Sequence, residues 1–549
     1  MPSPTEWSFV AVHDVVTDAV PDREMVVCGD VRRTYAQVRE RSRALARLLV
    51  DGGVGRRRER GGLERWELGQ DTVALVLHNG AEYLEAMYGA FRARAVPFNV
   101  NQHYRSAEVA GLLGDVGPSA VVYHRRYGPL VAAGCDTSSI VLVDVDDGSG
   151  VAPLAGSVPY EAVVTTPTGP DASDLPVTSP DDVYMVCTGG TTGRPKAVLW
   201  RQADAYVGAM AGAEDATAES IAAGARGWTA GPWYAVPPLM HAAAQWTAFS
   251  ALHLGATVLV HDDSLPFDAA SVLGLVERER AFMMSIVGDA HALPMAQELD
   301  RHDHDLSSLL VLGTGGAATS THLKDALLDH MPNVTIRDGY GASETGGMAF
   351  GAHTKGAPRV EFQPGVGAAV LSEDRARFLA PGDDELGWLA RRGRVPLGYL
   401  GDPDRTSATF PTVEGERVAV PGDRGRLLPD GSIALLGRDS LVVNTGGEKV
   451  FVEEVEAVLR SHPQVHDALV VGRPSERFGS ETVALVATLP GGDPGPAELR
   501  EFVAERLARF KAPRAVVRCD EIRRLANGKG DYVWAAEVAL DAETVGAAD

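Results

Sequence analysis

The stretch TGGTTGRPKAV, residues 188–198, decides how the rest of the chain can be interpreted. It follows VYMVC (183–187), an apolar run that predicts a buried strand. Glycine and threonine directly after such a strand can bend the chain sharply and aim backbone N–H groups and hydroxyls at an anion. Because Lys196 is followed by Ala197, the stretch lacks the GxxxxGK[ST] order of the nucleoside triphosphatase loop. On these residues alone, a phosphate-binding turn and a plain connecting turn both remain open.

Apolar runs of strand length recur on both sides of this turn. VALVL (73–77) and SLLVLG (308–313) are two of them. Amphipathic segments of helix length lie between the runs, among them AEYLEAMYGAFRAR (81–94) and FDAASVLGLVERER (267–280). This alternation predicts α/β layers built on parallel sheet. A chain of 549 residues is too long for one core, so more than one domain is expected.

A second domain is predicted near the C-terminus. Glycine, proline and aspartate cluster in PGDRGRLLPDG (421–431), a turn-rich stretch. Helix-like and strand-like segments begin again after it, enough for a small α+β domain of about a hundred residues. We place the boundary at Asp439, which gives an N-terminal domain over residues 1–438 and a C-terminal domain over residues 439–549.

Charge and composition restrict the class of partner and the compartment. With 51 basic and 74 acidic residues, the formal net charge of −23 repels polyanions, so nucleic acid is disfavoured as a partner. The four cysteines are scattered, which fits a reducing cytoplasm and argues against thiolate-bound zinc. No apolar run approaches the roughly 18 residues of a membrane span, and the N-terminus lacks a secretion signal. We expect a cytoplasmic enzyme, with the basic run Arg56–Arg60 as a solvated loop.

The full order hydroxyl-Gly-Gly-Thr-Thr-Gly-Arg-Pro-Lys resembles the signature loop of the adenylate-forming superfamily. That superfamily includes acyl-CoA synthetases, adenylation domains of peptide synthetases and firefly-type luciferases. Its other motifs follow here in order, as LGTGGAA (312–318), DGYGASETG (338–346), PGD ending in Asp423, LLGRDS (435–440), NTGGEKVFVEEVE (444–456) and ANGKGDYVW (526–534). The resemblance covers nearly the whole chain, and it implies a large multi-sheet α/β domain followed by a small mobile α+β domain.

The resemblance implies a site for ATP and Mg²⁺. Tyr340 would stack on the adenine, Ser343 would contact the α-phosphate, and Glu344 would hold Mg²⁺. A lone carboxylate beside a glycine-rich turn suits a hard cation that keeps several waters, although the same residues could simply cap a turn. Asp423 would accept hydrogen bonds from both ribose hydroxyls, and Arg438 would contact ribose or phosphate. The other nucleotide-binding positions that the resemblance implies are Thr188, Gly189, Gly190, Thr191, Thr192, Gly193, Lys196, Gly315, Gly316, Ala317, Asp338 and Gly339.

Two further matches imply the use of CoA and a moving domain. The Gly446-Gly447 loop corresponds to the loop that lines the family's pantetheine tunnel, and Lys529 corresponds to its adenylation lysine. In the family the C-terminal domain rotates, so that first the lysine and then the glycine loop faces the active site. The hinge falls at Asp439 or Ser440 here. His241 occupies the position of a gate between ATP and acyl sites, although it could equally be an ordinary histidine at a helix N-terminus.

The implied chemistry explains why no catalytic triad is needed. A carboxylic acid titrates near pH ~4–5, so the nucleophile is already ionised and requires no general base. The obstacle is that one anion attacks another. Positive charge from Mg²⁺ and Lys529 around the α-phosphorus would meet this need. A thiol then attacks the acyl-adenylate and displaces AMP.

Several members of the superfamily remain candidates. Only twenty residues follow Lys529, so a free-standing acyl-CoA synthetase fits better than a peptide-synthetase module. The segments PPLMHAAAQW (237–246) and GYLGDPDRTSATF (398–410) resemble actinobacterial synthetases for long-chain or steroid side-chain acids. An adenylation enzyme that loads a carrier protein in trans, a luciferase-like oxygenase and a non-catalytic nucleotide- or acyl-binding homologue stay open as alternatives. The natural acid and the oligomeric state, including a homodimer, are not fixed by the sequence.

Two sets of residues are weaker candidates. The acyl pocket would be walled by side chains of mixed size, namely Trp233, Gln245, Trp246, Val287, Gly288 and Gly313. The CoA phosphates would need local positive charge, for which the candidates are Arg473, Arg477, Lys511 and Arg514. Solvated surface is the alternative for each of these basic residues.

Overall fold

The computed structural model describes residues 6–167, 174–189, 195–356, 362–445, 448–475, 479–525 and 528–540. Its largest sheet has nine strands, and the central ones run parallel. In spatial order they are β16 (Gln363–Pro364), β15 (Gly346–Ala352), β14 (Thr335–Ala342), β13 (Val311–Gly315), β12 (Met283–Ile286), β10 (Trp233–Ala235), β11 (Val258–Val260), β1 (Glu24–Cys28) and β2 (Val31–Thr34). Strands β2, β15 and β16 pair antiparallel at the two edges.

The two faces of this sheet are covered unequally. One face is sealed by α10 (Ala269–Glu279), α11 (Gly288–Leu299) and α12 (Thr321–His330), which pack on the buried residues Met284 and Leu312. On the opposite face the alternate residues of β12 and β13 are only half-buried, although both strands lie inside the sheet. Helix α9 (Ala242–His253) packs beside β10 on this side. The sheet therefore keeps a partly open strip that ends at Gly315.

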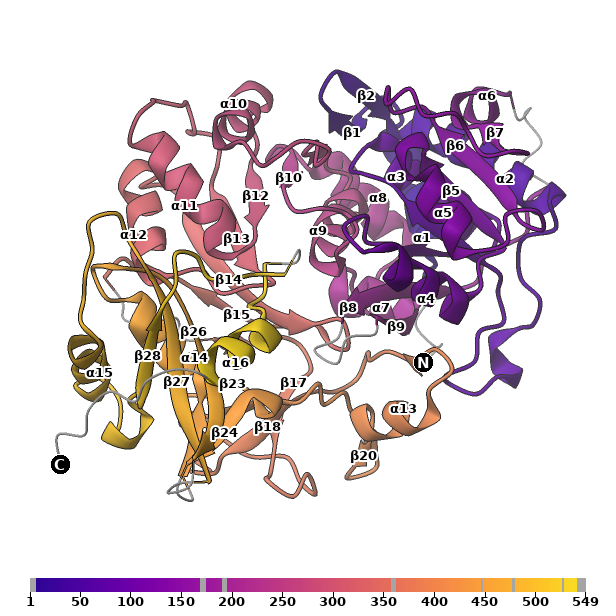
Figure 1. Cartoon of the computed structure of the whole chain (residues 1–549). Helices are drawn as coiled ribbons and strands as arrows, with labels where there is room; N and C mark the ends of the chain where they lie inside the picture. The colour runs from indigo at the N-terminus through magenta and orange to yellow at the C-terminus, as the bar shows by residue number, and fades with distance from the viewer. Residues whose placement is uncertain are drawn as a thin grey trace.

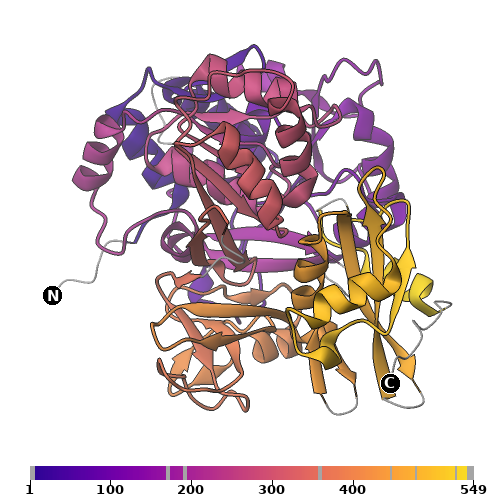
Figure 2. The same ribbon diagram turned by 90° about the vertical axis from the view of Figure 1, so that its left-hand side faces the viewer.

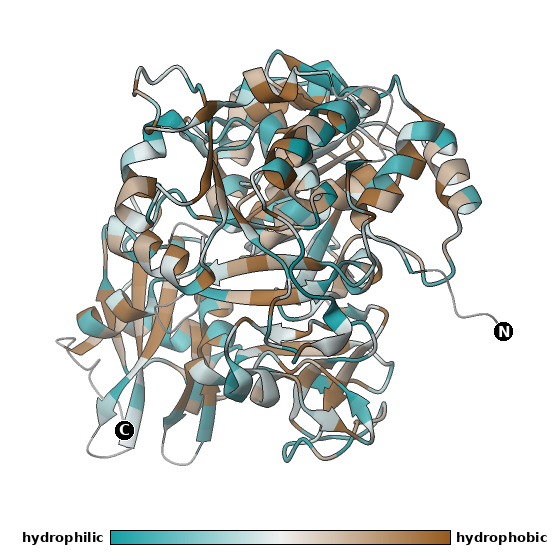
Figure 3. Ribbon diagram, turned by 90° about the vertical axis from the view of Figure 1, so that its right-hand side faces the viewer, coloured by the Kyte–Doolittle hydropathy of each residue, from teal (hydrophilic) through white to brown (hydrophobic). Residues whose placement is uncertain are grey.

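A second, five-stranded sheet is entirely parallel, as the alternating pattern predicted. Its strands are β4 (Val96–Asn99), β3 (Thr72–Val76), β5 (Ala120–His124), β6 (Val141–Val145) and β7 (Val158–Pro159). The helices of this region are α1 (Phe9–Ala19), α2 (Tyr35–Asp51), α3 (Ala81–Arg92), α4 (Ser106–Val116), α5 (Gly128–Gly134) and α6 (Tyr160–Val164). Hydrophobic residues follow the inner strands, and hydrophilic ones cover outer helices and loops (Figure 3).

The glycine-rich stretch joins the two strands of a hairpin. Strand β8 (Val183–Gly189) is the strand that VYMVC predicted, and β9 (Pro195–Arg201) pairs antiparallel with it. The short strand β19 (Gly398–Tyr399) adds to the outer edge of β9. Helices α7 (Gln202–Ala209) and α13 (Pro403–Thr409) pack on this sheet, whereas α8 (Ala218–Gly227) packs on α1.

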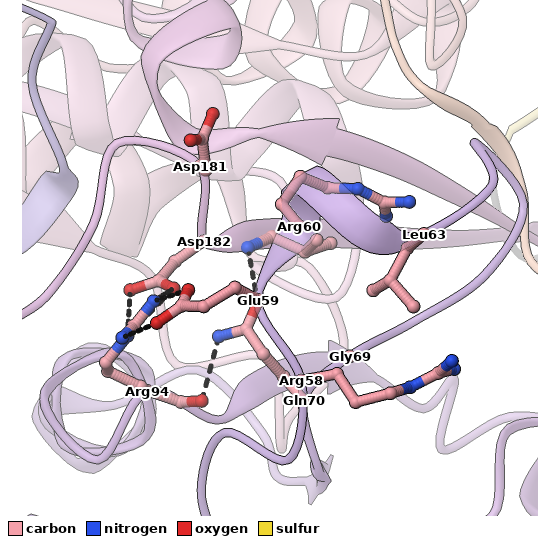
Figure 4. Close-up of a pocket in the computed structure, with 10 residues that line it drawn as sticks. Arg58, Glu59, Arg60, Leu63, Gly69, Gln70, Arg94, Asp181 and Asp182 are labelled. Carbon is pink, nitrogen blue, oxygen red and sulfur yellow. Dashed lines mark hydrogen bonds and ion pairs between the residues drawn. The ribbon is translucent and has the colours of Figure 1, made fainter.

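The arginine-rich run lies close to the start of β8 and is neutralised by neighbours. Arg56 pairs with Glu59 at 3.1 Å, and Arg57 pairs with Asp71 at 2.7 Å. Figure 4 shows Arg94 bound to both Glu59 and Asp182, the residue that precedes β8. The run is thus a loop, as predicted, in which Arg56 and Arg57 have acidic partners.

Another antiparallel sheet carries the chain toward the C-terminal lobe. Its strands are β17 (Ala368–Leu371), β18 (Gly387–Arg391), β22 (Asp423–Leu427) and β23 (Ile433–Arg438), and the hairpin of β20 (Thr412–Val413) and β21 (Glu416–Arg417) lies beside it. From Arg438 the chain passes through the 3₁₀ turn η4 (Asp439–Leu441) into the lobe. Figure 2 shows this lobe in yellow beside the orange sheet and below the large α/β part.

The small lobe is an α+β unit, as predicted, and Figure 1 shows its strands backed by its helices. Its elements are β24 (Val442–Thr445), β25 (Glu448–Phe451), α14 (Val452–Arg460), β26 (Val465–Ser475), β27 (Gly479–Thr488), α15 (Pro496–Ala504), β28 (Ala515–Arg518) and α16 (Tyr532–Leu540). The helical pattern of PAELREFVAERLARF (496–510) continues to Phe510, but α15 ends at Ala504, and Leu507 and Phe510 pack on the core of the lobe. In the part of the chain that the structure describes, no helix is long and apolar enough to cross a membrane.

Candidate active site

Asp423 is held by two donors where the start of β22 pairs with the end of β23. The hydroxyl of Tyr340 donates to its Oδ2 atom at 2.6 Å, and Nε of Arg438 lies 3.1 Å from Oδ1. Asp423 and Arg438 are partners in the strand register, so the ion pair follows from the sheet itself. Burial and the Asp423 carboxylate raise the pKa of Tyr340, which keeps its phenol neutral and able to donate. These two contacts fix the orientation of the Asp423 carboxylate.

The glycines of two motifs allow two parallel strands to end close together. Gly315 and Gly339 are register partners in β13 and β14, and a Cβ on Gly315 would lie 3.1 Å from the carbonyl oxygen of Gly339. Gly316 follows with φ of +75°, a conformation that favours glycine. The backbone can therefore approach a flat ligand at this edge. Next to it, Ala317 lies against Gly288.

Asp338 belongs to the same motif, but its carboxylate is engaged elsewhere. Lys324 donates to it at 2.5 Å and the hydroxyl of Thr314 donates to its other oxygen. This buried ion pair ties α12 to the sheet. Only the backbone of Asp338 is left for a ligand.

Ser343 and Glu344 form the turn between β14 and β15, and the turn is braced from outside. The indole of Trp200 donates to the carbonyl of Ser343 at 2.9 Å. The guanidinium of Arg391 donates to the carbonyls of Thr345 and Gly347 at 2.7 and 2.9 Å. With its backbone fixed, the turn presents the Glu344 carboxylate, which accepts a 2.6 Å hydrogen bond from Tyr399.

The two strands of the hairpin flank the predicted phosphate loop. Thr188 pairs with Lys196 across the hairpin, and Gly189 with Pro195. The loop residues Gly190, Thr191, Thr192 and Gly193 lie outside the described residues, as do Gly446 and Gly447 of the predicted pantetheine loop and Arg477. The ammonium of Lys196 lies 5.5 Å from the centre of the Tyr399 ring. Burial and Arg405 lower the pKa of Lys196, against the opposing effect of Glu344.

Lys529 reaches the site on a hairpin from the small lobe. The carbonyl of Lys529 accepts a hydrogen bond from the backbone N–H of Leu525. The guanidinium of Arg524 donates to the carbonyl of Gly528 at 3.0 Å and also to both carboxylate oxygens of Asp467. A Cβ on Gly528 would lie 3.2 Å from Val287 and 3.8 Å from Ala317, so the hairpin touches the large α/β part.

The Lys529 side chain is solvent-accessible, yet protein surrounds it on several sides. Burial and then Arg438 lower its pKa, while Glu344, Asp423 and Glu453 act in the opposite direction. Lys529 therefore lies within electrostatic reach of the carboxylates that the N-terminal motifs supply.

His241 lies in the same electrostatic environment at the N-terminus of α9. Burial, and secondarily Lys529, lower the pKa of His241 to about 4, so its imidazole is neutral at physiological pH. Its buried Nε2 atom has no hydrogen-bond partner within the described ranges. An unpartnered nitrogen beside Lys529 is consistent with a position facing a ligand.

The predicted wall of the acyl pocket is only partly supported. Val287 contacts the Lys529 hairpin through Gly528, and Gly313 lies on the half-open strip of β13. Gln245 is instead 2% exposed and fully engaged, because it accepts from the Tyr184 hydroxyl and donates to the Leu239 carbonyl. Gln245 is therefore held in the core by these two hydrogen bonds, and its place in the acyl-pocket wall stays a prediction.

Two of the basic residues suggested for CoA are committed to ion pairs. Arg473 binds Glu481 at 2.9 Å in the interior of the lobe. Lys511 binds Glu454 at 2.5 Å. Arg514 donates its backbone N–H to Thr482. Neither paired cation is available without breaking its pair.

Sequence reasoning missed several residues that organise the site. Asn99 bridges the carbonyls of Cys187 and Met240 at 2.7 and 2.6 Å, which ties the strand before the phosphate loop to the segment before His241. Tyr399 lies in GYLGDPDRTSATF, which indicated only a branch resemblance. Trp200, Arg391 and Asn99 carried no motif signal, because each acts through backbone carbonyls of distant segments.

Comparisons with known proteins agree with this architecture. The family model described as AMP-binding enzyme matches residues 14–399, and that of the AMP-binding enzyme C-terminal domain matches residues 454–529. The medium-chain acyl-CoA ligase Mig of Mycobacterium avium is 43% identical over 547 residues, covering 98% of this chain and 99% of Mig. A 3-oxocholest-4-en-26-oate–CoA ligase of Rhodococcus rhodochrous is 35% identical over 95% of this chain and 94% of its own.

Solved structures show the same fold. The anthranilate CoA ligase AuaEII, solved in complex with anthranoyl-AMP, superposes with a TM-score of 0.77 at 19% identity, covering 98% of both chains. At this identity the similarity concerns the fold alone. Because the family model matches well over half of the sequence and two relatives exceed 30% identity over nearly their full length, the chain belongs to the family of AMP-binding enzymes.

Proposed function

We propose that the protein is an AMP-forming acid–thiol ligase that converts ATP, a carboxylic acid and CoA into acyl-CoA, AMP and diphosphate. An acyl-adenylate is the intermediate, and a fatty or steroid side-chain acid is the substrate. The relatives named as acyl-CoA ligases support this reaction. The observation that carries the proposal is the contact of the Lys529 hairpin with Val287 and Ala317, which brings a cation of the small lobe within electrostatic reach of the Asp423 and Glu344 carboxylates.

We assign the ATP-binding roles as follows. Asp423, oriented by Tyr340 and Arg438, accepts hydrogen bonds from the ribose hydroxyls, and the Tyr340 ring and the Gly315–Ala317 turn contact the adenine. The hairpin of β8 and β9 receives the phosphates, with Lys196 directed to the two that leave as diphosphate. The support for these roles is the geometry of the fixed carboxylate and of the closely approaching glycine backbone.

The oxygen donors near Glu344 fit a hard divalent cation. Among the described residues, the carboxylate accepts one hydrogen bond, from Tyr399 to Oε1, and its turn is braced, so its second oxygen can act as a ligand. When bound there, Mg²⁺ would neutralise charge on the phosphates. The chain itself contributes Glu344 as ligand and Ser343 as a neighbour of the α-phosphate.

Lys529 and His241 complete the acyl transfer site. The carboxylate of the substrate attacks the α-phosphorus, the bond to diphosphate breaks, and the Lys529 ammonium offsets the charge that gathers on the α-phosphate. Neutral His241 can lie against the acyl group without adding charge. The thiol of CoA then attacks the acyl carbonyl carbon, and AMP leaves with the bonding electrons.

We further propose that residues 439–549 form a domain that rotates relative to residues 1–438. Support comes from the single covalent passage through η4, which contains both candidate hinge residues, Asp439 and Ser440. Rotation would withdraw Lys529 and bring the Gly446-Gly447 loop toward the adenylate for the thiol step. The scattered cysteines support a cytoplasmic location, where ATP and CoA are available.

A diphosphate-release assay tests the function directly. The protein is incubated with ATP, Mg²⁺ and a panel of medium-chain, long-chain and steroid side-chain acids, with and without CoA, and products are identified by mass spectrometry. We expect acyl-CoA to form with at least one class of acid. Adenylate that accumulates in the presence of CoA and is consumed only by a carrier protein would favour the carrier-loading alternative. Absence of diphosphate release with every acid would favour a non-catalytic homologue.

A further inference from the structure

Tyr399 is fixed in place by contacts on every side. Its strand pairs with β9, so Leu400 N donates to the Ala197 carbonyl at 3.0 Å, one residue from Lys196. Its own N–H donates to the hydroxyl of Thr406 in α13 at 3.0 Å. The ring packs on Phe410 at 5.7 Å and the residue is 4% exposed. Its phenol therefore has little freedom to change direction.

The phenol of Tyr399 meets Glu344, the carboxylate proposed above as metal ligand. The hydroxyl donates to Oε1 at 2.6 Å, within the short range typical of hydrogen bonds to a charged acceptor. In the described part of the chain, this is the one hydrogen bond that the Glu344 carboxylate receives. The orientation of this carboxylate therefore depends on Tyr399.

Two cations flank the same ring. The Lys196 ammonium lies 5.5 Å from the ring centre and the Arg405 guanidinium lies 5.8 Å from it, both within the range of a cation–π contact. Without the phenol, either cation could draw the carboxylate into an ion pair. Both cations therefore contact the ring whose hydroxyl holds Glu344.

We propose that Tyr399 is a positioning residue for adenylation: it holds Glu344 turned toward the metal–nucleotide complex and away from Lys196 and Arg405. The inference rests on the proposed function and extends it to a residue that touches neither substrate nor metal. A hydrogen bond to a metal-ligating carboxylate typically changes metal affinity or activity by about 10- to 100-fold when it is removed. Tyr399→Phe removes the hydroxyl with its hydrogen bonds to Glu344 and Thr409, and the ring and its packing on Phe410 remain.

The chain offers a matched control. Tyr160 is also buried, and its hydroxyl donates to the Glu85 carboxylate at 2.7 Å, in the five-stranded-sheet region. Tyr160→Phe therefore removes the same type of bond at a position that the proposal does not use. Thermal unfolding of both variants measures their structural cost.

The test measures metal binding at equilibrium, without acid or thiol. Mn²⁺ is titrated into the full-length protein in the presence of a non-cleavable α,β-methylene analogue of ATP, and free Mn²⁺ is followed by electron paramagnetic resonance. We expect Tyr399→Phe to weaken Mn²⁺ binding by roughly 10- to 100-fold and Tyr160→Phe to change it by less than about twofold. Binding of the analogue in EDTA should be unchanged in both variants.

Two results would overturn the proposal. One is a folded Tyr399→Phe variant that binds Mn²⁺ within about twofold of the parent protein. The other comes from adding Tyr399→Phe to a Glu344→Gln background: an equally large loss there means that Tyr399 does not act through Glu344. Because neither readout requires turnover, failure of the proposed ligase activity would show separately, as intact metal–nucleotide binding without diphosphate release.

Discussion

Glu453 lies where the small lobe packs on the sheet, and this packing disfavours the ionised form of its carboxyl group. It lies in the first turn of α14 and packs directly on Gly437 of β23. Burial, and then Glu456 and Asp423, raise its pKa from 4.5 to about 7, against the opposing effect of Arg438 and Arg460. Within the described ranges, no hydrogen bond reaches its carboxylate. We predict that Glu453→Gln stabilises α14 and that the gain grows with pH.

The sign and size follow from linkage. The Glu453 carboxyl binds a proton more tightly in the packed lobe than in the unfolded chain. Its contribution to stability is therefore fully present below pH 4.5 and is lost as the pH rises through 7. At pH 6 the penalty is about 2 kcal/mol, and at pH 8 it is about 3 kcal/mol, taking ~1.4 kcal/mol per pKa unit. Glutamine does not titrate. Its advantage over glutamate should therefore grow about tenfold in equilibrium constant between pH 6 and pH 8.

Hydrogen exchange read by mass spectrometry can measure this locally. Peptides covering α14 are compared between the two proteins at pH 6 and pH 8, with exchange corrected for its intrinsic pH dependence. We expect the ratio of protection factors, variant over parent, to be about tenfold larger at pH 8. Glu454→Gln is the control, because Glu454 lies on the same turn of α14 and is paired with Lys511. This variant loses an ion pair, so the protection of α14 should not increase with pH. Equal ratios at the two pH values would refute the reasoning.

Three further predictions concern the proposed reaction. Lys529→Ala should lower adenylate formation by orders of magnitude but spare the reaction of preformed acyl-adenylate with CoA, and equal loss in both half-reactions would contradict the domain rotation. Tyr340→Phe removes a hydrogen bond to the Asp423 carboxylate worth about 1.5–3 kcal/mol, so KM for ATP should rise roughly 10- to 100-fold in steady-state kinetics; an unchanged KM would show that the bond does not orient the ribose ligand. Gly528→Ala places a methyl group 3.2 Å from Val287 and should slow single-turnover adenylation several-fold, whereas Gly491→Ala, with a similar positive φ and open space around it, should share only the loss of stability.

The motifs predicted which residues would meet. Tyr340, Asp423 and Arg438 belong to separate motifs, and the structure joins them through a 2.6 Å hydrogen bond and a 3.1 Å ion pair. The alternating pattern also predicted the parallel sheets and the α+β lobe, because strand and helix periodicity follow directly from side-chain direction. Their roles in binding ATP and acid stay predictions until the assays above are done.

What the sequence by itself determined is the order of elements and the set of chemical groups: a strand followed by a glycine-rich turn, a carboxylate after a tyrosine, and a lysine in a C-terminal hairpin. Only the tertiary structure decided how each polar group is used. It turned the Asp338 carboxylate to Lys324, committed Gln245 to Tyr184, and set Tyr399 against Glu344. The physical reason is that a buried polar group takes whichever partner the packing of distant segments brings within about 3 Å, and that distance is not encoded in any local pattern.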